Sequence, residues 1–190
     1  MRVKQIATGL WYWTGLHPAW TPADGGPDGW EQEVGCVHYE APSAVVLFDP
    51  LVPPEDAARF YEALDRDVER AWLPVHVLTT VDAHRRSSHE LAERYGATVG
   101  ERPDGIEIGA EAWNEVVYWI PEHRALVTGD VLITRGGRLE VPRAWVGDDY
   151  DKAVARLRPL LELPVKRVLV THGEPVLADA QKSLKQALAH

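Results

Sequence analysis

The hydrophobic residues of this chain fall into short runs separated by polar turns, a pattern that indicates many strands and a few helices. Runs rich in β-branched and aromatic residues predict two strands within 3–15 and further strands at 34–39, 43–48, 75–78, 97–99, 106–108, 116–120, 125–128 and 166–170. Apolar residues at helical spacing predict helices over 54–70, 87–95, 148–161 and 177–188. Ser87, with Glu90 three positions later, has the spacing of a capping box at the start of the second helix. Two strand-rich regions, each followed by strand–helix units, predict an α/β fold: an αββα sandwich of two mixed sheets with helices outside.

Two stretches lack this regularity. Residues 16–32 are rich in proline and glycine and predict a loop, and Trp20 and Trp30 lie in or beside it. We expect this loop to be the cover of any site beneath it. Residues 131–145 are also expected to be irregular, with a turn at the pair Gly136-Gly137.

The amino-acid composition limits the classes of protein to which this chain can belong. The chain has 190 residues, of which 45% are apolar, so we expect one domain over 1–190 with a hydrophobic core. It has no apolar run of membrane-spanning length and no signal-peptide core, and we expect a cytoplasmic protein without a membrane partner. The net charge of −9, with scattered basic residues, argues against nucleic-acid binding. Cys36, the single cysteine, excludes an internal disulfide and a cysteine-rich zinc cluster.

Polar side chains follow several of the predicted strands. Apolar strands run into the polar turns 79–85, 128–130 and 171–173, and Glu111 comes just before a fourth strand. Each turn alone is common, but their combined order suggests that the side chains converge on one cleft. Two imidazoles and up to three carboxylates in one cleft would form a metal site or an acid–base site.

The order of these turns resembles the metallo-β-lactamase superfamily, the αββα-sandwich hydrolases that include glyoxalase II and similar thioesterases and lactonases. The matching stretches are 77–97, 111–132 and 168–175, together with Phe48-Asp49-Pro50-Leu51, and they cover nearly the whole chain. The resemblance implies hydrolysis of an ester, thioester or lactone-type carbonyl in a small-molecule substrate.

The metal-binding motif of that family is largely replaced. Where the family has two ligand histidines, the motif aspartate, a further histidine and the histidine before the hairpin, this chain has Thr80, Asp82, His84, Arg85 and Glu111. Only the bridging carboxylate, Asp130, and the last histidine, His172, match the pattern.

The altered set leaves two metal arrangements open. Asp82, Glu111 and Asp130 would form an all-oxygen group suited to Mg²⁺, Mn²⁺ or Ca²⁺. His84, Asp130 and His172 would suit Zn²⁺ or Fe²⁺. An ion in either arrangement would lower the pKa of a water and polarise a substrate carbonyl.

Arg85 argues against a metal, because its permanent positive charge would stand where a ligand histidine belongs. It could pair with the nearby carboxylates instead, so we favour a metal-free site over one Zn²⁺, Fe²⁺ or Mn²⁺ ion. Two functions then stay open. In a divergent hydrolase, His172 and Asp130 would activate water, Asp82 and His84 would assist, and Arg85 would stabilise the oxyanion. The alternative is an inactive relative that binds a small molecule or serves as an interaction module.

Overall fold

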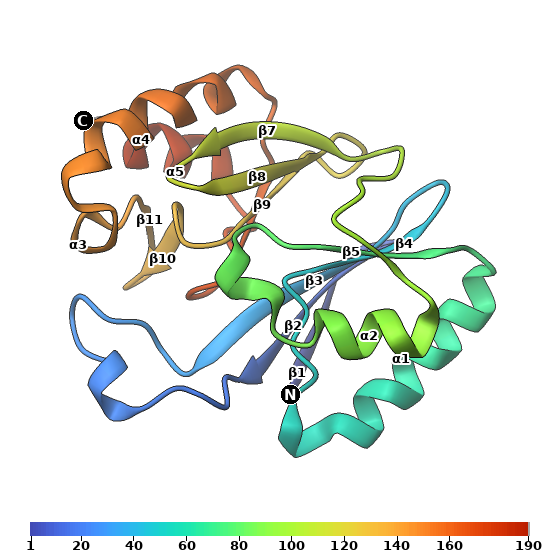
Figure 1. Cartoon of the computed structure of the whole chain (residues 1–190). Helices are drawn as coiled ribbons and strands as arrows, with labels where there is room; N and C mark the ends of the chain where they lie inside the picture. Colours follow the sequence, from blue (N-terminus) through green and yellow to red (C-terminus); the bar gives the residue numbers. More distant parts are fainter. Residues whose placement is uncertain (190) are drawn as a thin grey trace.

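Two mixed β-sheets form the centre of the computed structural model, which describes residues 1–189 (Figure 1). The first sheet has the order β1-β2-β3-β4-β5-β6, with β1 Arg2–Ala7, β2 Leu10–Leu16, β3 Glu33–Glu40, β4 Val45–Phe48, β5 Val75–Leu78 and β6 Thr98–Val99. The second has the order β12-β9-β8-β7, with β7 Glu107–Ala112, β8 Glu115–Ile120, β9 Ala125–Thr128 and β12 Arg167–Val170. Parallel pairs occur in both sheets, β4 with β5 and β5 with β6 in the first and β9 with β12 in the second.

Helices cover the outer face of each sheet (Figure 1). The helices are α1 Ala57–Ala71, α2 Ser88–Tyr95, α3 Arg143–Val146, α4 Tyr150–Leu157 and α5 Ala180–Ala187. α1 and α2 pack on the first sheet, and α4 and α5 on the second. The predicted αββα sandwich is therefore confirmed. Of the helices within residues 1–189, none has the length and apolar composition needed to cross a lipid bilayer.

Strand β4 illustrates how the layers are held together. Val45 and Leu47 point to the helix side of the sheet, whereas Val46 and Phe48 point to the second sheet. All four side chains are buried, as the continuous apolar run predicted. The strand thus contributes to two core layers and fixes the position of the turn that follows it.

The stretch 131–145 is more regular than expected. β10 (Ile133–Arg135) and β11 (Arg138–Glu140) form an antiparallel hairpin around the predicted glycine turn, and α3 follows. Thr134 donates its backbone N–H to the carbonyl of His172 at 3.0 Å. The hairpin was missed because strands this short carry too few residues for a periodic pattern.

The predicted capping box of α2 is wrong. The Ser87 hydroxyl accepts a hydrogen bond from the backbone N–H of Val52 at 2.9 Å and makes no cap bond to its own helix. Glu90 accepts a hydrogen bond from the Tyr61 hydroxyl on α1. Both side chains therefore connect α2 to neighbouring segments of the chain. The spacing of the two residues in the sequence could not reveal these distant partners.

Candidate metal centre

Four strands end at the same edge of the sandwich and deliver the polar side chains of the site. In the first sheet, Asp49 directly follows β4, and β5 runs into the turn that carries His84. In the second sheet, Asp130 follows β9 and His172 follows β12. Because each pair of strands is parallel, their carboxyl ends lie together. Three of the sequence-predicted residues, His84, Asp130 and His172, converge in this way.

These three side chains are arranged around a common point. The Nε2 atoms of His84 and His172 lie 3.2 and 3.1 Å from Oδ1 of Asp130, and the three donor atoms all lie within 4.8 Å of one another. Ligands bound at about 2.1 Å to one ion stand roughly 3.0–3.4 Å apart, so the two contacts to Oδ1 fit a bound cation.

Asp130 Oδ1 supports the same interpretation. This buried atom has no partner with hydrogen-bond geometry among residues 1–189, although two imidazoles are close to it. A buried carboxylate oxygen without a well-aligned hydrogen-bond donor is free to bind a cation. Two imidazoles and one carboxylate can bind a metal, and three protein ligands leave positions open for water or substrate.

His84 is held by the buried carboxylate of Asp49. Its Nδ1 lies 3.0 Å from Oδ2 of Asp49, which also accepts hydrogen bonds from the hydroxyls of Thr80 at 2.7 Å and Thr171 at 3.1 Å. A carboxylate on Nδ1 keeps the proton there and turns Nε2 outward as a lone-pair donor, the usual support of a metal-binding histidine. Without an ion, burial lowers the pKa of His84, but Asp49 and Asp130 outweigh this and raise it to about 9.

Glu115 is a site residue that the sequence analysis missed. Its buried carboxylate accepts hydrogen bonds from the backbone N–H groups of Gly129, Asp130 and Val131 at 2.6–2.7 Å. It thereby shapes the turn that presents Asp130. Gly129 is required there, because a Cβ at this position would collide with the Thr80 hydroxyl. The feature of the sequence that could have revealed Glu115 is its position at the start of an apolar strand.

Three tryptophans line the cavity above the trio formed by His84, Asp130 and His172. The cavity measures about 390 Å³ and is lined by the trio together with His17, Arg86, Trp30, Trp113 and Trp145. The rings of Trp30 and Trp145 each meet the ring of His172 edge-on, with centroids 5.3 Å apart. Trp20 donates its indole N–H to the Trp30 carbonyl at 2.9 Å. The loop 16–32 therefore lies over the site as expected, with Trp30 in contact and Trp20 supporting it.

Comparison with solved structures identifies the architecture. A metallo-β-lactamase from Erythrobacter litoralis aligns with a TM-score of 0.62 at 12% identity, over 98% of this chain and 90% of its own. The metallo-β-lactamase IND-7 aligns with a TM-score of 0.62 at 14% identity, over 100% and 98%. One from Pontibacter korlensis gives 0.55 at 17% identity, over 99% and 97%. The chain has the metallo-β-lactamase fold. No protein-family model matches its sequence, and no curated protein does either.

Three predicted residues lie outside the site of this metallo-β-lactamase fold. Asp82 and Arg85 are exposed and form an ion pair at 2.9 Å, because the 3₁₀ turn Asp82–Arg85 turns both outward and His84 inward. Glu111 is exposed on β7, where alternation directs Ala112 into the core instead. The all-oxygen group, one of the two metal arrangements left open by the sequence, is therefore not assembled. Arg85 therefore does not place its positive charge among the candidate ligands, and the nearby cation to consider is its neighbour Arg86.

Arg86, the next residue, is the cation that the metallo-β-lactamase fold brings to this cavity. Its guanidinium donates to the carbonyls of Asp49 at 3.0 Å and Gly35 at 3.5 Å, and its Nε has no partner among the described residues. Its backbone has φ 32° and ψ −110°, a costly conformation for a residue with a side chain. The hydrogen bonds of its guanidinium hold a positive charge on the cavity wall that His84 and His172 also line, despite the backbone strain.

Proposed function

We propose that this protein is a hydrolase that holds one divalent cation through His84, Asp130 and His172 and cleaves an ester, thioester or lactone-type carbonyl. The observation that supports this most directly is the convergence of two imidazole Nε2 atoms on the unpartnered Oδ1 of Asp130. The fold is one of hydrolases, which agrees with the chemistry of these donors. A cation held there would lower the pKa of a water molecule and polarise the substrate carbonyl.

The protein's own residues prepare the site for this reaction. Asp49 fixes the tautomer of His84 and Glu115 fixes the turn that carries Asp130. Both are buried, so neither is free to rotate away between turnovers. Of the metals considered, Zn²⁺ and Fe²⁺ suit two imidazoles and a carboxylate best.

The cavity walls indicate a substrate with an apolar part and a negative charge. The indoles of Trp30, Trp113 and Trp145 offer apolar surface to a substrate. Arg86 is the permanent cation on the cavity wall and could bind a carboxylate beside the scissile carbonyl.

Metal content tests the centre itself. Mass spectrometry on protein purified without chelators should find about one ion per chain, and His172→Ala should lose it. His89→Ala is the matched control, because His89 is exposed on α2 and should leave the metal content unchanged. A metal-free wild type would overturn the proposal.

Turnover on a panel of esters, thioesters, lactones and a β-lactam then tests the reaction. For a substrate that carries a carboxylate, Arg86→Gln should lower kcat/KM about 10–100-fold, whereas an uncharged analogue should change little. Arg85→Gln is the control, since that exposed neighbour lies outside the cavity. Equal effects at the two arginines would contradict the role of Arg86.

A second function, metal-free ligand binding, is favoured by one observation. His84 bridges Asp49 and Asp130, so a protonated imidazole could neutralise both buried carboxylates without an ion. This alternative predicts no turnover on the panel and a stability that a chelator does not change.

A further inference from the structure

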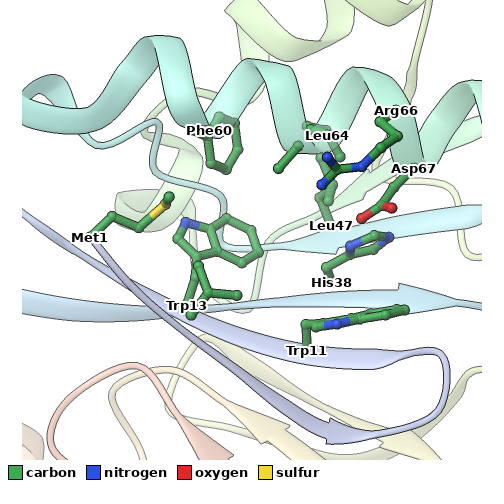
Figure 2. A pocket seen from close by; sticks show the side chains of 11 residues that line it. Met1, Trp11, Trp13, His38, Leu47, Phe60, Leu64, Arg66 and Asp67 are labelled. Atoms are coloured by element: carbon green, nitrogen blue, oxygen red, sulfur yellow. The ribbon is translucent and has the colours of Figure 1, made fainter.

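A second cavity lies between α1 and the outer face of β1, β2 and β3, and it shares no residue with the metal centre (Figure 2). Its volume is about 190 Å³. Trp11, Trp13 and Phe60 provide aromatic walls, and Leu47 and Leu64 close it toward the core. Val3, which also lines the cavity, is an exposed apolar side chain at its edge.

His38 is the unusual member of the wall. Its side chain is only 7% exposed, yet its Nε2 has no hydrogen-bond partner among residues 1–189. The ring stacks on Trp11 with centroids 5.0 Å apart and an interplanar angle of 23°. Burial lowers the pKa of His38, so it is neutral at pH 7. A buried imidazole nitrogen without a partner is energetically costly, and a hydrogen-bonding group from a bound molecule would relieve that cost.

The charges at the rim offset each other. Arg66 and Asp67 border the cavity from α1, and Asp67 also lies 3.5 Å from Arg70. The rim therefore offers no unbalanced charge to attract an ion. Aromatic walls, one neutral polar group and a balanced rim all favour an uncharged ligand.

We propose that this cavity, lined by Trp11, Trp13, His38 and Phe60, binds a small uncharged aromatic molecule that carries one hydrogen-bonding group. A cavity of roughly 150 Å³ accepts benzene, so the volume here admits a single substituted ring. The ring would pack on the indoles, and its polar group would pair with the imidazole of His38.

Titration of the ¹⁵N-labelled protein with phenol and with toluene, followed by NMR, tests the proposal. The indole N–H signals of Trp11 and Trp13 report the cavity. Phenol should bind about tenfold more tightly than toluene, because only phenol can pair with His38. His38→Phe keeps the stacked ring and removes the nitrogens, so it should abolish the preference for phenol.

Ala63→Phe provides a second test that does not depend on His38. Ala63 lines the cavity from α1, and a phenyl ring there should fill the space and prevent both ligands from binding. Ala58→Phe, on an exposed position of the same helix, should leave binding unchanged. Equal affinity for phenol and toluene in the wild type would overturn the proposal, as would binding that persists in Ala63→Phe.

Discussion

Single side chains decide whether this chain can present a metal centre, and Glu115 is the clearest case. Its buried carboxylate accepts three backbone hydrogen bonds from the turn that carries Asp130. Burial, with a smaller contribution from the charge of Asp130, raises the pKa of Glu115 to about 8, although the three backbone hydrogen bonds oppose this shift. Its exposed neighbour Glu111 has the same chemistry but no such partners.

The pair of glutamates gives a matched stability test. Glu115→Ala should lower the free energy of unfolding by about 3–5 kcal/mol, because it leaves three N–H groups unpaired and opens a cavity. Glu111→Ala should change it by less than about 0.5 kcal/mol. Urea denaturation measures both, and similar losses in the two variants would contradict the assigned role of Glu115.

His38 gives a pH-dependent prediction. Since burial lowers its pKa below the ordinary 6.5, the unfolded chain binds more protons than the folded chain once the pH falls below that value. Its contribution to stability is therefore complete above pH 6.5 and is lost as the pH falls. Asp67 and Glu40 oppose the lowered pKa, and Arg70 adds to it.

The measurement is the free energy of unfolding between about pH 7 and pH 5. His38→Phe should reduce its slope, whereas His89→Phe, on the exposed side of α2, should leave the slope unchanged. An unchanged slope in His38→Phe would mean that this histidine is not held neutral.

At the scale of elements, α2 shows that residues with capping-box spacing can form tertiary hydrogen bonds instead of capping their own helix. Ser87 and Glu90 have capping-box spacing, but Ser87 binds the backbone of Val52 and Glu90 binds Tyr61 on α1. These bonds tie the helix to the turn after β4 and to the neighbouring helix.

The two residues should therefore differ in their effect on stability. Ser87→Ala leaves the N–H of Val52 unpaired and should cost about 1–2 kcal/mol. Glu90→Ala removes an exposed contact and should cost less than about 0.5 kcal/mol. Thermal denaturation of both variants tests this difference. If the two residues did form a capping box, Ser87→Ala and Glu90→Ala would lower the stability by similar amounts.

At the scale of the whole molecule, metal binding should increase the free energy of unfolding. An ion that binds only the folded chain stabilises it by about 2.7 kcal/mol at a concentration 100 times its Kd. For a protein of this size that is a rise in Tm of about 5–10 °C. The rise should be seen with Zn²⁺ or Fe²⁺, vanish with a chelator, and be absent in His172→Ala. A wild-type Tm that no divalent ion moves would argue for the metal-free alternative.

Much of the architecture could be read from the order of residues alone. The apolar runs marked most of the strands, and their arrangement with the helices predicted the two-sheet sandwich. Asp130 and His172 were found because each lies two residues after a buried strand, where a strand end has a defined place in the sheet, and because both match the pattern of the family that the sequence resembles. His84 was found because its turn follows β5.

The tertiary structure decided which of the adjacent polar residues face inward. Within one turn, His84 and Arg86 point to the cavity, while Asp82 and Arg85 pair in solvent. Glu115 and Asp49 become site residues only through partners 14 and 35 positions away in the sequence. The periodic pattern of apolar residues is sufficient to predict a helix or a strand, because the pattern and the element both extend over a few neighbouring residues. The direction in which each side chain of a turn points depends on contacts with residues far away in the sequence, which a local pattern does not contain.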